Sequence, residues 1–195
     1  TEQKLSMLYL KSQVNPHFMY NVLCSIALMS QMDGNTDIQK MASNFAGLTQ
    51  ARLSSGGDIK IPLAQELQYA KFYIELQQMR FGNKISYQVS VSDEALLSCL
   101  VPKLTLEMLV ENAVGHGIEP KEGPGTVRVS VGCTENGALE LVVTDDGVGF
   151  AGQNGQIQLP LDLPAAGSRH NRVALNTVYQ MLKHLYGPEY GIRIT

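Results

Sequence analysis

A heptad-spaced seam through residues 2–32 is the feature that most restricts how this chain can fold. Its positions recur at alternating intervals of three and four residues: Leu5, Leu8, Ser12, Asn15, Met19, Val22, Ile26 and Met29. This spacing places the side chains on one face of a helix and predicts packing against other helices. Pro16 lies inside the same helix, where it lacks an N–H group and clashes with the preceding turn. The seam also turns polar at this point, so we expect a bendable turn.

His17 directly follows the proline and lies two residues from each neighbouring seam position, so it should point outward. A sequence that keeps such a local defect usually has a use for it. We therefore interpret His17 as a nucleophile that accepts a phosphoryl group; the alternative is an ordinary surface histidine. Asn21 lies four residues later and on the same helix face.

A second helix is predicted after the break at 33–35, because Thr36 and Gln39 form a capping-box pattern. Its apolar stripe consists of Ile38, Met41, Phe45 and Leu48. Two such helices form a hairpin that cannot bury both stripes alone, so we expect a homodimer with a four-helix bundle. The Ser- and Gly-rich residues 54–58 predict a domain boundary, which gives a hairpin over 1–56 and a second domain over 57–195.

The second domain mixes helices with strands, which predicts an α+β fold. The expected helices are Pro62 to about Phe81, a segment after Pro102 that ends at 115–117, and 173–186. The expected strands are 84–91, 127–131, 139–143 and the start of one at 191–195, with Asn136-Gly137 as a hairpin turn. Residues 151–171 show little periodicity, and so long a loop often forms a functional lid.

Composition excludes several classes of function. The net charge of -3 argues against binding to nucleic acid. The three cysteines, Cys24, Cys99 and Cys133, are far apart and predict reduced thiols. The uncharged run over 12–32 contains too short an apolar part to cross a membrane. No signal peptide is recognised, and the chain opens in mid-helix, so we expect an excised piece of a longer protein.

Two motifs in the second domain have a chemical rationale. Asn112 lies in the helical segment 109–117, and an asparagine oxygen can hold the Mg²⁺ that bridges phosphates. Asp145 ends a strand, where its carboxylate can accept a hydrogen bond from the exocyclic amine of adenine. Gly147 and Gly149 follow it and allow the backbone to approach a nucleotide closely.

With these motifs in this order, the chain resembles the cytoplasmic kinase core of sensor histidine kinases of the LytS/YesM type. Residues 15–21 resemble the family's Asn-Pro-His-Phe-x-Tyr-Asn phosphoacceptor motif, 109–117 its asparagine box and 145–149 its glycine box. The last two are shared with the gyrase, Hsp90 and MutL ATPases. The resemblance implies a two-layer α/β sandwich ATP-binding domain behind the hairpin. It also implies autophosphorylation of His17 from Mg-ATP and transfer to an aspartate of a response regulator in a bacterial two-component system.

The resemblance also assigns roles to residues. Asn112 would coordinate Mg²⁺, Asp145 would bind adenine, and Gly147 and Gly149 would shape the pocket. Asn21 would help orient water for dephosphorylation of the partner.

Other assignments stay open. Ala174 and Leu175, where the lid meets its helix, would adjoin the phosphates through free N–H groups of the helix N-terminus. His116 would touch nucleotide or serve only as a helix-end residue. Glu111 would support Mg²⁺ or polarise a water, or belong to a solvated helix face. Membrane attachment is implied only through upstream segments that precede such a core in the family, which makes this chain a cytoplasmic domain of a cell-membrane protein.

Two departures from the family pattern favour an alternative function. Gly115 replaces a basic residue, and the segment Arg172 to Leu175 lacks the family's Gly-x-Gly-Leu. The alternative is a degenerate kinase-like module that dimerises, binds nucleotide weakly and transfers poorly. A third candidate is a gyrase-like ATPase, against which Met108 argues because those relatives place a catalytic glutamate four residues before the asparagine.

Overall fold

The structure is a computed structural model that describes residues 26, 45, 59–149 and 169–194. These residues fall into two compact units, one with Ile26, Phe45 and 59–149 and one with 169–194, and each is described by itself. Ile26 and Phe45 are both helical, as the hairpin predicts. His17, Asn21, the boundary near residue 56 and the expected lid lie outside the described residues.

Helix α4 (Leu63–Phe81) opens the larger unit and confirms the helix expected after Pro62. Proline is well tolerated immediately before or at the start of a helix, where its missing N–H would have no helical partner. The helix ends at Gly82, whose φ of +62° is a conformation that L side chains rarely adopt.

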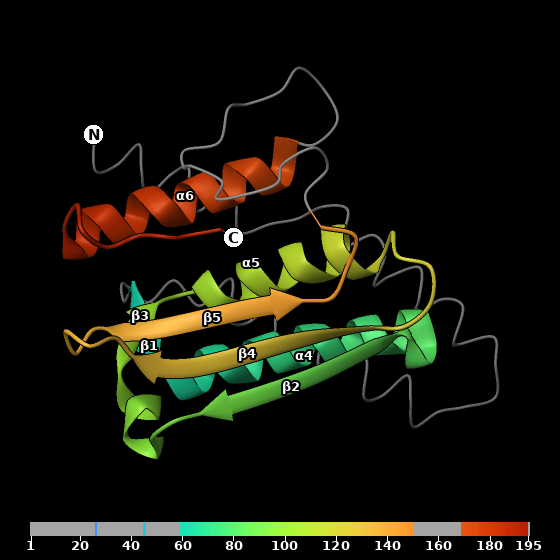
Figure 1. Cartoon of the computed structure of the whole chain (residues 1–195), viewed down its shortest axis with the longest axis horizontal. Helices are drawn as coiled ribbons and strands as arrows, with labels where there is room; N and C mark the ends of the chain where they lie inside the picture. Colours follow the sequence, from blue (N-terminus) through green and yellow to red (C-terminus); the bar gives the residue numbers. More distant parts are fainter. Residues whose placement is uncertain (1–25, 27–44, 46–58, 150–168, 195) are drawn as a thin grey trace. The chain divides into compact units, whose positions relative to one another are not determined.

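Three strands form one sheet in the order β2-β4-β5. Strand β2 (Ile85–Val91) pairs in parallel with β4 (Gly125–Cys133), and β4 pairs antiparallel with β5 (Leu139–Asp145). The β4–β5 hairpin closes through Gly137 at φ +76°, which confirms the turn expected at Asn136-Gly137. In Figure 1 these strands lie in front of α4 and α5, which places helices on one face of the sheet.

Helix α5 (Thr105–Asn112) is confirmed in the segment after Pro102 and continues into the π-helical turn η3 (Ala113–Ile118). Two strands of three residues were not predicted: β1 (Lys60–Pro62) pairs antiparallel with β3 (Leu100–Pro102). Such short strands carry no readable alternation. Two 3₁₀ turns, η1 (Gly82–Lys84) and η2 (Glu94–Ser98), complete this unit.

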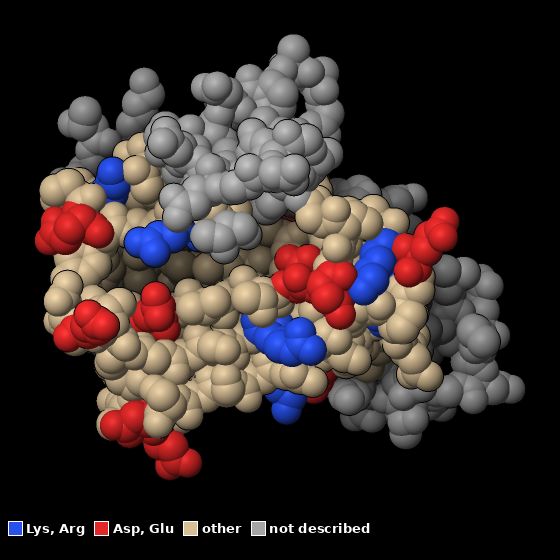
Figure 2. Space-filling view, viewed as in Figure 1, with Lys and Arg blue, Asp and Glu red and all other residues tan. Residues whose placement is uncertain are grey.

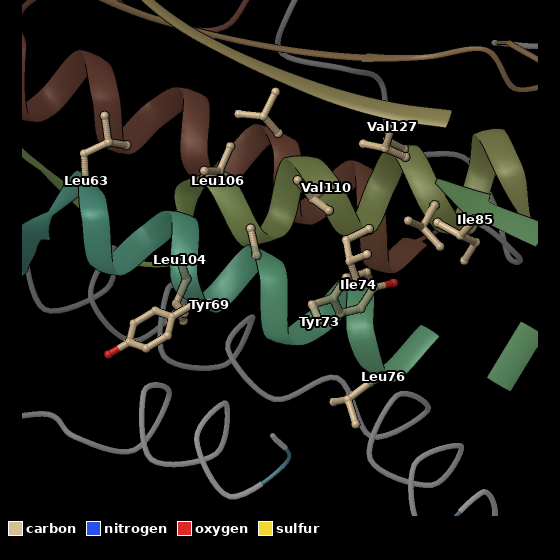
Figure 3. Packing of buried hydrophobic residues seen from close by; sticks show 14 of the residues in the cluster. Leu63, Tyr69, Tyr73, Ile74, Leu76, Ile85, Leu104, Leu106, Val110 and Val127 are labelled. Atoms are coloured by element: carbon tan, nitrogen blue, oxygen red, sulfur yellow. The ribbon is translucent and has the colours of Figure 1, made fainter. Parts of the chain in front are cut away.

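The core of the larger unit lies between the sheet and the two helices. Figure 3 shows side chains of α4 interleaved with those of α5, with Val127 from the sheet above them. Ten of its fully buried or nearly buried members are labelled there: Leu63, Tyr69, Tyr73, Ile74, Leu76, Ile85, Leu104, Leu106, Val110 and Val127. Because α5 packs on both α4 and the sheet, its position depends on both layers.

The smaller unit contains α6 (Arg169–Tyr186), which begins before the expected Val173. Leu175, Val178 and Met181 are buried and recur at helical spacing. The strand expected over 191–195 is not formed over residues 191–193, and Ile194 alone takes part in a β-bridge. The mixture of helices and strands in the described residues confirms the α+β class.

Candidate functional site: the end of strand β5 against the π turn

The two glycine-bearing motifs of the larger unit are in direct backbone contact. A Cβ atom at Gly147 would lie 2.2–2.3 Å from backbone atoms of Gly117, closer than any real contact allows. The N–H of Val148 donates to the carbonyl of Gly117 at 3.0 Å. The end of β5 is therefore joined to turn η3 at a place where only glycine fits.

Asp145 presents its carboxylate at this junction. A Cβ at Gly117 would lie 2.2 Å from its Oδ1, so the missing side chain of Gly117 makes room for the carboxylate. Oδ1 accepts a hydrogen bond of 2.9 Å from the N–H of Gly147. This bond fixes the carboxylate and leaves Oδ2 as an acceptor for a ligand. An adenine amine fits this arrangement because it is a hydrogen-bond donor.

Asp146 has a different role from its neighbour. Its Oδ1 accepts bonds from the N–H of Thr126 at 2.8 Å and from Nζ of Lys121 at 3.1 Å. The Thr126 bond, followed by the Lys121 bond, lowers the pKa of Asp146. Asp146 therefore fastens the end of β5 to the start of β4, whereas Asp145 keeps one oxygen for a ligand.

Asn112 is half-buried at the end of α5, and its orientation is set by one bond. Its Nδ2 donates to the carbonyl of Met108, one turn earlier, at 2.7 Å. Only the amide nitrogen can donate to a carbonyl, so Oδ1 is the atom directed to another partner. A hard cation such as Mg²⁺ prefers such an oxygen, together with phosphate oxygens. No cluster of three or more His, Cys, Asp or Glu ligands occurs among the residues described.

The π turn after Asn112 widens the helix toward the site. The N–H of Glu119 donates to the carbonyl of Val114 at 2.8 Å, a span of five residues. His116 is exposed on this turn and Glu111 is half-buried before it. A Cβ at Gly115 would meet nothing within 4 Å, so a side chain would fit at this position. Single π turns inside helices frequently occur at functional sites.

The structure brings some of the expected site residues together and leaves others apart. It joins the turn that follows Asn112 to Asp145 and Gly147, and Gly149 follows with φ +71°. Leu175 is buried in α6, which belongs to the other unit, so its relation to this site and that of Ala174 stay predictions. The roles of His17 and Asn21 also stay predictions.

Three contributors at this junction were not singled out from the sequence. Gly117 belongs to the Gly-x-Gly pair of the asparagine box, and that pair was a readable signal. Asp146 and Lys121 form an ion pair over 3.1 Å that no sequence spacing indicates.

Figure 2 shows acidic and basic side chains interspersed on the face in view. Among the described residues, no helix has both the length and the apolar character needed to cross a membrane.

Residues 5–85 match the histidine kinase family. The chain is 30% identical over 190 residues to the sensor histidine kinase YpdA of Escherichia coli, covering 97% of this chain and 32% of that protein. It is 30% identical over 185 residues to the sensor histidine kinase YesM of Bacillus subtilis, covering 95% and 30%. It is 28% identical over 192 residues to the sensor protein LytS of Oceanobacillus iheyensis, covering 98% and 32%.

Among solved structures, the histidine kinase domain of the Erythrobacter litoralis EL346 blue-light activated histidine kinase matches with a TM-score of 0.41 and 17% identity. That match covers 93% of this chain and 86% of the other. The chain spans about a third of the length of the curated relatives named above. Over 95–98% of its length, the chain is similar to sensor histidine kinases of the LytS/YesM type.

Proposed function

We propose that this chain is an ATP-dependent protein-histidine kinase core that phosphorylates its own His17 and passes the phosphoryl group to an aspartate of a response regulator. The observation that carries the nucleotide part is the junction between Gly117 and Gly147, which fixes Asp145 with Oδ2 left as an acceptor. The match to the histidine kinase family and the similarity to YpdA support the kinase part.

The described residues fit Mg-ATP as the phosphoryl donor. Asp145 Oδ2 would accept from the adenine amine, and Asn112 Oδ1 would hold Mg²⁺, whose charge neutralises phosphate oxygens during transfer. Glu111, His116 and Gly149 would line the same site. By their place in the family motif, Ala174 and Leu175 would also bind ATP. The protein contributes mainly by positioning these groups.

His17 would attack as the neutral imidazole, because a protonated ring nitrogen has no lone pair for phosphorus. We therefore expect autophosphorylation to fall as pH drops below the ordinary histidine pKa, about 6.5. Asn21, on the same helix face, would orient water for dephosphorylating the partner.

The oligomer and partners follow from the same assignment. Two copies would pair through their hairpins (residues 1–56) into a four-helix bundle, and the ATP-binding domain (57–195) would follow. A receiver domain would accept the phosphoryl group at an aspartate. Attachment to a bacterial cell membrane would come from segments outside this chain, which leaves this part in the cytoplasm.

The decisive experiment is incubation of the dimeric chain with Mg-ATP labelled on the γ-phosphate. We expect label that is acid-labile and alkali-stable, and that is lost in His17→Ala and in Asn112→Ala. The matched controls are His184→Ala and Asn83→Ala, which change an exposed histidine and an exposed asparagine outside the site. Label that survives in His17→Ala would refute the assignment of the phosphoacceptor.

The degenerate binding module is the second candidate, because Gly115 leaves open space where the family has a basic group. It would give nucleotide binding without phosphohistidine. A titration of the same sample with nucleotide distinguishes this outcome from an empty site.

A further inference from the structure

Glu66 is a fully buried carboxyl group in the apolar face of α4. Its side chain is 0% exposed, as are those of Leu63 and Ala70, three residues before and four residues after it. A charge-bearing side chain is almost never fully buried unless it is paired. Its partners therefore indicate what it does.

Both oxygens of Glu66 accept backbone N–H groups from the start of α5. Oε1 accepts from Leu104 at 2.5 Å and Oε2 from Leu106 at 2.9 Å. Leu104 has φ +65° and is the only non-glycine residue with positive φ among those described. This strained conformation turns two nearby N–H groups toward one point, a concavity of the type that binds anions. Here the anion site is filled by a side chain from another helix.

The acidic and phenolic groups around Glu66 come from both helices. Burial is the main cause that raises the pKa of Glu66 to about 8, and the negative charge of Glu107 on α5 adds to it, whereas hydrogen bonds from backbone N–H groups of α5 lower it. Tyr69 lies on α4 itself and feels the charge of Glu66. Keeping a carboxyl group in this place is costly, which indicates that the bond to α5 has a use.

We propose that Glu66 is a positioning residue for Asn112: it fixes the first turn of α5 to α4 and thereby sets where the Asn112 amide oxygen is presented. The inference rests on the proposed role of Asn112 in holding Mg²⁺. Helix α5 spans only Thr105 to Asn112, about 12 Å, so a tilt at its first turn reaches its last residue. Leu106 and Val110 are both 0% exposed and pack the helix as one rigid piece.

The second end of the link is α4, which follows the segment expected to carry His17. A displacement of α4 along its axis would pull on Leu104 and Leu106 through one carboxyl group. Glu66 thus connects the helix that comes after the phosphoacceptor hairpin with the helix that carries the metal ligand.

The first test measures hydrogen exchange in the full chain without nucleotide, at a pH above the Glu66 pKa of about 8, for the parent, Glu66→Gln and Gln78→Ala. At this pH both oxygens of Glu66 are free of protons, whereas glutamine has the same shape but turns its NH₂ group to an N–H of α5, so one donor is left without an acceptor. Gln78 is the matched control, because its Nε2 also ties α4 to a backbone carbonyl, that of Ile85 in β2, at 2.9 Å. We expect exchange protection in residues 104–112 to fall about tenfold in Glu66→Gln, with β4 unchanged.

The second test measures nucleotide affinity with Mg²⁺ and with EDTA, and compares the ratio of the two affinities. A general loss of stability affects both affinities alike, whereas a displaced Asn112 lowers only the ratio. We expect the ratio to fall about tenfold in Glu66→Gln, the usual effect of losing a group that orients a metal ligand. The ratio should stay unchanged in Gln78→Ala. In a chain that already carries Asn112→Ala, adding Glu66→Gln should not lower the ratio further.

The outcomes separate this inference from the proposed function. Unchanged protection of 104–112 in Glu66→Gln, or equal losses in α5 and β4, overturns the positioning role whatever the nucleotide result. If the ratio is unchanged in Glu66→Gln but falls to one in Asn112→Ala, the positioning role of Glu66 is overturned, whereas the proposed metal site is retained. A parent chain without Mg²⁺-dependent binding refutes the proposed function and, with it, the role toward Asn112. If Glu66→Gln does not fold, Glu66→Asp, shortened by one methylene, replaces it in both measurements.

Discussion

The two ends of helix α5 differ in how firmly they are held. At its first turn, Leu104 and Leu106 are buried and both donate to Glu66 of another helix. At its last turn, Asn112 is half-buried and donates to the carbonyl of Met108 in its own helix, and the chain continues into a π turn with the exposed His116. One end is fixed by a long-range contact, and the other opens toward the candidate site.

This difference shows that a short helix can be held rigidly at its first turn while its last turn stays more open. We call the first turn the fixed end and the last turn, with the π turn that follows it, the permissive end. The strained backbone at Leu104 is tolerated because burial and two hydrogen bonds hold it. The glycines of the π turn are not held in such a backbone conformation. There, the close contact between the backbone of Gly117 and Gly147 is what restricts the residues that fit. Perturbing each end should therefore give different kinds of defect.

The largest effect is expected for Gly147→Ala, because this residue contacts the π turn at the permissive end of α5. The new Cβ would overlap the backbone of Gly117, so the end of β5 and the π turn must separate. Because backbone cannot move aside as a flexible side chain can, we expect a loss of about 3 kcal/mol of stability. The same separation should abolish measurable nucleotide binding. Urea unfolding and a nucleotide titration measure the two effects.

Gly132→Ala is the matched control for this change, because its Cβ would lie 3.7 Å from the hydroxyl of Ser92, an ordinary contact. We expect it to change stability by less than about 0.5 kcal/mol. Equal behaviour of the two alanine variants would show that the junction is not tightly packed.

The second effect concerns the fixed end and the pH dependence of stability. Burial raises the pKa of Glu66 from 4.5 to about 8 in the folded chain. The folded state therefore holds this proton more tightly than the unfolded state, and the stability gained is present below pH 4.5 and lost as pH rises toward 8. Relative to Glu66→Gln, which cannot titrate, the parent should lose up to ~1.4 kcal/mol per pH unit in this window.

Urea unfolding of the parent and of Glu66→Gln at steps of pH measures this difference directly. The charge of Glu107 also raises the pKa of this carboxyl group, so a variant with Glu107→Gln checks how much of the slope comes from the neighbouring charge. A difference that does not change with pH would mean that Glu66 keeps its ordinary pKa in the fold.

The third effect separates the two aspartates at the permissive end. In Asp145→Asn, the oxygen can keep the bond to the N–H of Gly147, but an NH₂ group then replaces Oδ2, which is the proposed acceptor for the adenine amine. We expect ATP affinity to fall by about 1.5–3 kcal/mol, the value of a hydrogen bond to a charged group. Asp146→Asn should leave affinity nearly unchanged, because Asp146 bonds Thr126 and Lys121. Similar losses in both variants would refute the division of roles.

Much of this unit could be predicted from local sequence signals. Helix α4 follows from Pro62 and Gly82, and the β4–β5 hairpin from alternation around Asn136-Gly137. Strands β1 and β3 are three residues long, too short to show any period. The strand expected to start at 191–195 is reduced to a bridge at Ile194 among the described residues 191–194.

The candidate site was predictable in its residue types but not in its contacts. Glycine at 147 indicated a close approach, yet the atoms that approach it in the structure are backbone atoms of Gly117. Glu66 interrupts the apolar stripe between Leu63 and Ala70, which is a readable anomaly. Its partner Leu104 lies 38 residues away, and no local pattern specifies such a pairing.

The smallest effect expected is a gain, from Gly115→Lys at the permissive end. Gly115 has open space around its Cβ, so a lysine can be added without a clash and would restore the basic group of the family near the phosphates. Gly115→Ala is the control, because both variants gain about 0.5–1 kcal/mol of stability from replacing glycine in a helical turn. Only the lysine should also raise ATP affinity, by about threefold, a gain that weakens with added salt. If Gly115→Ala raises the ATP affinity equally, the gain comes from a stiffer turn. In that case the glycine at the permissive end, rather than the missing charge, limits ATP binding.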